Sequence, residues 1–207
     1  MRILLIRHGQ TPGNVLGQLD TAYPGPGLTT EGIAQAELLN NSLSEIPLEA
    51  IYVSTLKRTA LTATPLANAR GIDIRELPGV HEIEAGELEL RSDRPAIERY
   101  LQTIYEWGTG NLDARMPGAG TGAEFFSRFD EALGAVASVH SGSVAVFSHG
   151  AAIRVWVSSR AVNVPVTFGV ENRLANTGVV IIESDSNGSW QLVEWEGQTP
   201  REMGYAS

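Results

Sequence analysis

The segment Ile3-Leu4-Leu5-Ile6-Arg7-His8-Gly9-Gln10-Thr11 decides the fold that this sequence predicts. Its four consecutive apolar residues indicate a short strand inside a sheet. Arg7 and His8 follow at once, and Gly9 lets a ligand approach the backbone closely. Ligands of open α/β sheets bind beyond the carboxyl ends of the strands. A guanidinium holds anions bidentately and an imidazole reacts near neutral pH, so we expect a phosphate site centred on His8.

Further polar side chains follow predicted strands along the chain. Arg58 comes shortly after a strand at 50–53, Glu82 after one at 72–77, and His149 directly after one at 143–147. These strands alternate with predicted helices, and right-handed crossovers between parallel strands bring all their carboxyl ends to one edge of the sheet. We therefore expect these side chains to gather with His8, although Glu82 stands in a run of carboxylates of a kind that is usually only solvated.

The remaining pattern predicts the other elements. Residues 12–27, rich in Gly and Pro, indicate a loop without helix or strand. Ser54 is expected to cap the helix that carries Arg58. Strands at 177–182 and 190–195 are expected to form a terminal hairpin that turns at 186–188. Further helices are expected at about 29–43, 95–107, 121–136 and 151–159.

Composition excludes several classes of protein. The 207 residues fit one domain, and we expect it to span 1–207 with an insertion or cap at about 83–120. The absence of cysteine excludes disulfides and thiolate chemistry. The net charge of −9 argues against nucleic-acid binding, and no apolar run reaches the length of a membrane span. We expect a cytoplasmic protein that binds a small phosphorylated substrate without nucleic acid or membrane, with a homodimer left open.

Four separated blocks resemble the histidine phosphatase superfamily. They are Arg7-His8-Gly9-Gln10-Thr11 with Asn14, residues 28–36, residues 54–63, and Glu82 with Gly86 four residues on. The segment Ser148-His149-Gly150 also matches the family. Leu90 departs from the pattern, because glycine is usual there. The resemblance implies a phosphoglycerate mutase-like α/β fold: a three-layer α/β/α sandwich with a mostly parallel central sheet.

The resemblance also implies a reaction. His8 would attack phosphorus and form a phosphohistidine, and Glu82 would protonate the leaving alkoxide and then activate water. The side chains expected to hold the phosphate are Arg7, Asn14, Arg58 and His149, and a protonated His149 would add another charged donor. The implied chemistry needs no cofactor or metal. The expected function is a metal-independent phosphomonoesterase acting on a small phosphorylated metabolite.

Alternatives stay open at this point. A cofactor-dependent phosphoglycerate mutase shares the catalytic blocks, and a non-catalytic, phosphate-dependent scaffold protein is the rival from another class. A metal site of His8, His149 and Glu82 fits by residue type, but the neighbouring arginines would repel a cation. Substrate selection is expected in the loop and the insertion, from Gln10, Gln18, Tyr23, Arg91, Arg94 and Arg115.

Overall fold

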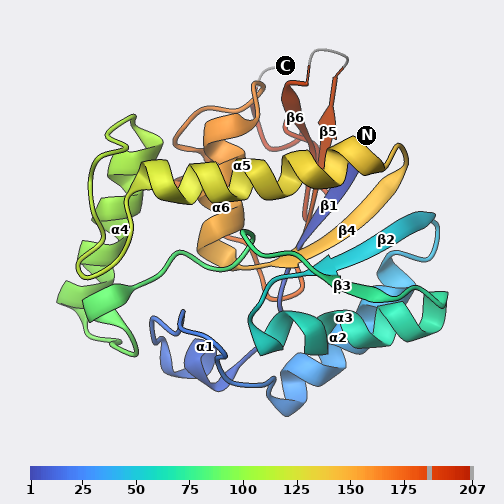
Figure 1. Cartoon of the computed structure of the whole chain (residues 1–207), viewed down its shortest axis with the longest axis horizontal. Coiled ribbons are helices and arrows are strands. Elements are labelled where there is room, and N and C mark those ends of the chain that lie inside the picture. The colour runs from blue at the N-terminus through green and yellow to red at the C-terminus, as the bar shows by residue number, and fades with distance from the viewer. Residues whose placement is uncertain (186–187, 206–207) are drawn as a thin grey trace.

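A six-stranded sheet forms the centre of the computed structural model, which describes residues 1–185 and 188–205 (Figure 1). Its spatial order is β3-β2-β4-β1-β5-β6. The strands are β1 (Arg2–Arg7), β2 (Leu48–Val53), β3 (Ile74–Glu76), β4 (Ser143–Ser148), β5 (Val179–Ser184) and β6 (Trp190–Trp195). The first four pair in parallel, whereas β5 runs antiparallel to β1 and β6 antiparallel to β5. The mostly parallel sheet and the antiparallel hairpin are confirmed, but Ser186 and Asn187 of its predicted turn lie outside the described residues.

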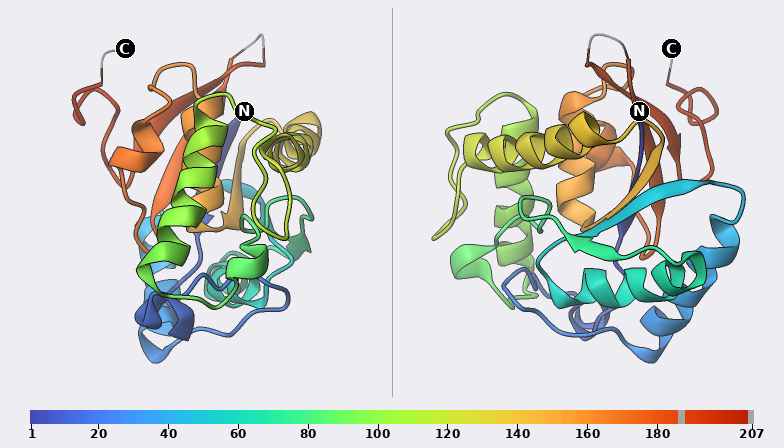
Figure 2. Two further views of the ribbon diagram at one scale, coloured as in Figure 1. Left: turned by 90° about the vertical axis from the view of Figure 1, so that its left-hand side faces the viewer. Right: turned by 45° about the vertical axis from the view of Figure 1, so that its right-hand side comes forward.

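Helices cover both faces of the sheet and make the three layers that the sequence predicts (Figures 1 and 2). On one face lie α2 (Thr30–Ser42) and α3 (Lys57–Arg70). On the other lie α4 (Arg94–Gly108), α5 (Gly122–Val139) and α6 (Gly150–Arg160). The short helices are α1 (Pro12–Leu16), the 3₁₀ helix η1 (Gly86–Leu88) and α7 (Phe168–Glu171). None of the described helices has the length and apolar character needed to cross a membrane.

The side chains of β1 show how the strand divides the core. Leu4 and Ile6 point to one face and pack in the cluster that α2 and α3 complete. Ile3 and Leu5 point to the other face, into the larger cluster under α4, α5 and α6. All four are fully buried, which explains why this strand is an unbroken apolar run and does not alternate with polar residues.

Strand register brings the polar turns together. Arg7 pairs with Ser148 across β1 and β4, and Val53 pairs with Phe147 across β2 and β4. The three strands therefore end at nearly the same level. The ladder continues for one residue, because His8 N–H donates to the carbonyl of Ser148 at 3.1 Å. The residues that follow these strands thus start from one edge of the sheet.

Local expectations fail at two places. The segment 12–27 contains α1, whose first turn is capped by the Thr11 hydroxyl, so a loop without helix was wrong. Ser54 does not cap α3 either, because that helix begins later, at Lys57, with Leu56 at the cap position. Leu90 stands where the family usually has glycine. Its φ of 60° is a left-handed conformation that glycine adopts more easily than leucine.

Candidate active site

His8 is buried at the carboxyl end of β1 with one ring nitrogen fixed. Nδ1 lies 2.7 Å from the carbonyl oxygen of Gly9, which only accepts, so Nδ1 carries the proton. Nε2 then holds the lone pair. Burial, followed by the charges of Arg58 and Arg7, lowers the pKa of His8 well below its ordinary value. The imidazole is therefore neutral at physiological pH, as a nucleophile must be.

His149 lies beside His8, with the ring centroids 5.2 Å apart. Its Nδ1 accepts from Nε of Arg58 at 3.3 Å, so its Nε2 carries the proton and donates to the Ser54 hydroxyl at 2.7 Å. Burial, and then the charge of Arg58, lowers the pKa of His149 well below its usual range. In this arrangement His149 is neutral and does not supply a charged donor.

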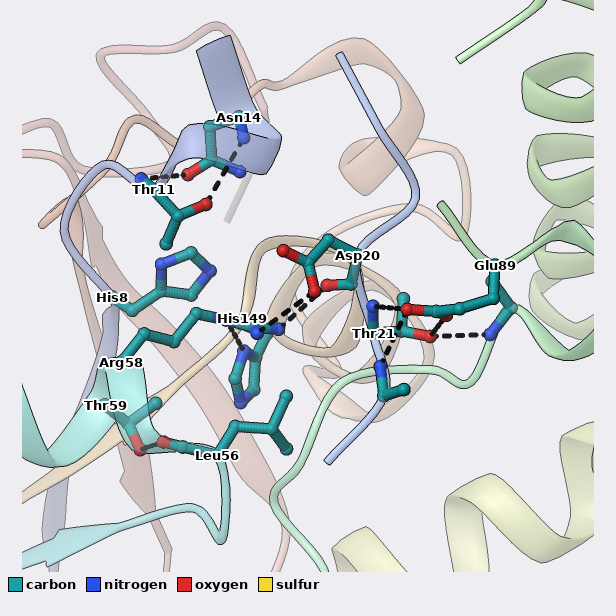
Figure 3. A network of polar contacts seen from close by, with 12 residues as sticks. His8, Thr11, Asn14, Asp20, Thr21, Leu56, Arg58, Thr59, Glu89 and His149 are labelled. Carbon is teal, nitrogen blue, oxygen red and sulfur yellow. Dashed lines mark hydrogen bonds and ion pairs between the residues drawn. The ribbon is translucent and has the colours of Figure 1, made fainter. Parts of the chain in front are cut away.

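Two buried guanidinium groups face the same space with unused donors. Arg7 Nη1 donates to the carbonyl of Leu174 at 2.7 Å, while its buried Nε has no hydrogen-bond partner among the described residues. Arg58 donates to His149 and, at 3.1 Å, to the carbonyl of Asp20 (Figure 3). Its buried Nη1 lies 3.9 Å from the carboxylate of Asp20 but has no hydrogen-bond partner in the described part of the chain. A buried donor without a partner costs free energy unless a ligand satisfies it. These two N–H groups therefore point to an anion.

Asn14 presents its amide to the cavity because its oxygen is occupied. The backbone N–H of Thr11 donates to Asn14 Oδ1 at 3.1 Å, which fixes which side of the amide is oxygen. Asn176 Nδ2 donates to the same oxygen at 3.0 Å and also to the carbonyl of His8 at 3.0 Å. The Nδ2 of Asn14 makes no hydrogen bond to the residues that the structure describes, and the side chain lines the cavity.

Glu82 is held against the N-terminus of α6. One carboxylate oxygen accepts from the backbone N–H of Ala152 at 2.8 Å, and the other from that of Ala151 at 3.1 Å. The guanidinium of Arg128 binds the carbonyl oxygens of His81 and Glu82 and so fixes this stretch of backbone. Glu82 therefore lies in the same cavity as His8, at a helix end that favours a carboxylate.

Glu89 ties the loop 17–27 to the site. Its carboxylate accepts from the backbone N–H groups of Thr21 and Ala22 at 2.8 and 3.0 Å, and from the Thr21 hydroxyl (Figure 3). The neighbouring Asp20 has its carbonyl bound to Arg58 and its carboxylate 3.9 Å from the same guanidinium. Glu89 thus positions a partner of Arg58 and does not itself line the cavity.

The cavity that joins these side chains has a volume of about 1080 Å³. At one end lie Arg7, His8, Asn14, Arg58 and Glu82. From there it extends along α6 and α7 to a wall formed by Ile97, Leu101 and Tyr105, which occur one turn apart on α4. This wall therefore comes from a helix within the segment 83–120. A phosphate fills a small part of this space, so there is room for the rest of an ester.

Of the residues predicted to select substrate, one lines the cavity and the others lie elsewhere. Gln18 lines the cavity. Tyr23 lies in a neighbouring pocket, and Gln10 accepts a hydrogen bond from Thr29. The three arginines are not brought to the cavity, because Arg91 pairs with Asp93, Arg94 with Glu98 and Arg115 with Glu124.

Two cavity arginines, Arg154 and Arg173, escaped sequence reasoning. Arg154 carries the one charge in the apolar run Ala151–Val157, and that isolated charge was a usable signal. Arg173 lies just before β5 in a segment with no recognisable pattern. Among the described residues, no three imidazole, carboxylate or thiolate groups come together in a way that could hold a metal ion.

The chain is similar in sequence to known proteins. A sequence model of the histidine phosphatase superfamily (branch 1) matches residues 3–198. A PE-PGRS family protein, PE_PGRS11, of Mycobacterium tuberculosis strain H37Rv is 37% identical over 208 residues, which cover 93% of this chain and 36% of that protein. The adenosylcobalamin/alpha-ribazole phosphatase of Salmonella typhimurium is 33% identical over 128 residues, covering 62% of each. This chain thus spans about a third of the length of the first relative and 62% of that of the second.

Solved structures share the fold. The mycobacterial glucosyl-3-phosphoglycerate phosphatase, solved in complex with VO3, superposes with a TM-score of 0.80 over 95% of this chain and 99% of that one. Its sequence is 18% identical, so the likeness concerns the fold alone.

Proposed function

The chain belongs to the histidine phosphatase superfamily, and from that premise we propose that it is a metal-independent phosphomonoesterase that acts on a small phosphorylated metabolite through a phosphohistidine. The observation that carries the proposal is the arrangement around His8. Its Nε2 is unprotonated, and two buried guanidinium donors, Arg7 Nε and Arg58 Nη1, line the same cavity with no hydrogen-bond partner in the part of the chain that the structure describes.

The phosphoryl group is bound by the donors that have no hydrogen-bond partner among the described residues. Arg7 and Arg58 supply one buried N–H each and Asn14 supplies its amide, so the equatorial oxygens are stabilised while charge develops on them. Nε2 of His8 attacks phosphorus in line, and the N–P bond forms as the ester P–O bond breaks. The proton stays on Nδ1, hydrogen-bonded to the carbonyl of Gly9.

Glu82 is the candidate acid and base. In the first step it transfers a proton to the leaving alkoxide, and in the second it takes a proton from the water that attacks the phosphohistidine. Its position in the same cavity as His8, beside the N-terminus of α6, supports this role. Because His149 is neutral and bound to Arg58, its role is to orient that guanidinium in the unliganded state.

Substrate identity is part of the proposal only as a class. Relatives are named for alpha-ribazole phosphate and glucosyl-3-phosphoglycerate, both small phosphorylated metabolites. The mutase alternative shares the chemistry at His8. The segment Glu98-Arg99-Tyr100-Leu101 resembles the basic motif that usually follows the acid in mutases, but it lacks the glycine of that motif. We therefore prefer hydrolysis.

The test is phosphate release from a panel of phosphomonoesters in the presence of a chelator. Wild type is compared with His8→Ala and with His140→Ala, a matched control whose ring pairs with Glu49 outside the cavity. We expect release by wild type and by the control, and none by His8→Ala. Isomerisation of phosphoglycerate faster than phosphate release would favour the mutase. Phosphate binding without any turnover would favour the scaffold protein.

A further inference from the structure

Arg154 is an anchored cation on the long side of the cavity. It lies one turn into α6, and its Nε donates to the carbonyl of Gly169 in α7 at 2.6 Å. That bond fixes the direction of the guanidinium. Its two terminal nitrogens make no hydrogen bond to the residues that the structure describes, while the side chain lines the cavity.

Arg173 lines the same cavity as Arg154. It comes directly before Leu174, whose carbonyl binds Arg7, so its backbone is tied to the phosphate end of the cavity. In keeping with their place in one cavity, the charge of Arg173 is, after burial, among the causes that lower the pKa of Arg154.

Neither cation has a carboxylate partner. The ion pairs among the described residues involve other side chains, and none includes Arg154 or Arg173. Glu82 attracts Arg154 through space, but both of its oxygens already accept backbone N–H groups of α6. Two neighbouring cations that line one cavity repel each other until an anion lies between them.

We propose that Arg154 and Arg173 form a subsite for a second acidic group, so that the preferred substrates are phosphomonoesters whose alcohol part carries a carboxylate or another anion. This inference rests on the proposed function. In-line attack by His8 expels the alcohol on the side of phosphorus opposite the imidazole. Beyond its phosphate end the cavity extends along α6 and α7, and both arginines line it.

The probes are two esters that differ in one group. In 3-phosphoglycerate the carbon chain ends in a carboxylate, and in glycerol 3-phosphate it ends in a neutral hydroxymethyl group. We expect wild type to have a kcat/KM at least about tenfold higher for the carboxylate ester, since hydrogen bonds to a charged group are worth about that factor. Arg173→Met, at an exposed position, should reduce this preference, and Arg154→Met should reduce it further.

Arg2→Met is the matched control. It removes the same charge, but Arg2 pairs with Glu183 at the opposite end of β1, and it should keep the preference unchanged. Binding of the same two esters to His8→Ala, measured by calorimetry, provides a readout that needs no turnover. There too the carboxylate ester should bind more tightly, and Arg173→Met in that background should reduce the difference.

The outcomes separate the two proposals. Turnover of both esters with equal kcat/KM, unchanged in Arg173→Met, overturns the subsite and leaves the phosphatase intact. Absence of turnover together with selective binding of the carboxylate ester overturns the phosphatase and leaves the subsite. Equal binding of both esters to His8→Ala contradicts the subsite even if the enzyme is active.

Discussion

At the scale of single residues, Arg58 has the most demanding position in the site. Its side chain is 2% exposed, and its three nitrogen atoms have three different tasks. Nε donates to His149, Nη2 donates to the carbonyl of Asp20, and Nη1 is left for a ligand. Only a planar fork with several donors can do this, so lysine is not a conservative replacement here.

We predict that Arg58→Lys lowers kcat/KM by about 100-fold or more, the cost of losing one oriented donor to a developing phosphoryl charge. The ammonium would reach one of the three partners and leave the other two unsatisfied. Steady-state kinetics on any active ester, with thermal unfolding to verify the fold, measure the effect. A variant that is folded and retains wild-type kcat/KM would remove Arg58 from the site.

At the scale of elements, the segment between α7 and β5 supports the phosphate end of the cavity. Leu174 binds Arg7 through its carbonyl, and Asn176 joins the carbonyl of His8 to the amide oxygen of Asn14. The segment comes from the far end of the sequence, yet it lies directly against the first turn of the chain, because β5 pairs with β1.

We predict that Asn176→Asp lowers kcat/KM by roughly tenfold to 100-fold. The substitution keeps the size of the side chain but replaces the amide donor by an acceptor that faces the oxygens of His8 and Asn14. KM should rise and competitive inhibition by inorganic phosphate should weaken together, because Asn14 is no longer held. Asn176→Ala serves as the comparison, and a larger defect in Ala than in Asp would contradict this explanation.

Elements also show what the sequence could predict and what it could not. His8 and His149 directly follow strong apolar strands, so the topology of a parallel sheet was enough to expect them at one edge, and the structure brings them there. Arg154 and Arg173 follow no strand. Their place in one cavity depends on how α6 packs against α7. Ser54 was predicted to cap a helix, but its hydroxyl binds an imidazole 95 residues away, which no local rule indicates.

At the scale of the whole molecule, a net charge of −9 coexists with a cavity lined by several arginines. The local field, and not the total charge, determines which ligand enters. The same cations, together with burial, keep His8 and His149 neutral, and the pKa of His81 is lowered to about 4 by burial and then by Arg128.

Stability should therefore fall as the pH falls from 7 to 5. The unfolded chain takes up protons on these histidines near their ordinary pKa of about 6.5, whereas the folded chain does not until a lower pH. These neutral histidines do not lower the free energy of unfolding above pH 6.5. Below that pH, each histidine lowers the free energy of unfolding by up to about 1.4 kcal/mol per pH unit. Urea unfolding at both pH values measures this, and His149→Gln should reduce the slope. A free energy of unfolding that stays constant or rises between pH 7 and 5 would contradict the neutral histidines.

The most direct test of the central claim is to trap the phosphorylated enzyme. Wild-type enzyme is mixed, in the presence of a chelator, with an ester that it hydrolyses, and the reaction is quenched within the first turnover. Its peptides are then analysed by mass spectrometry under alkaline conditions that preserve phosphohistidine. The account predicts one phosphoryl group on the peptide that contains His8, absent from His8→Ala. A phosphoryl group on another residue, or active enzyme that turns over ester with no phosphorylated intermediate, would contradict it.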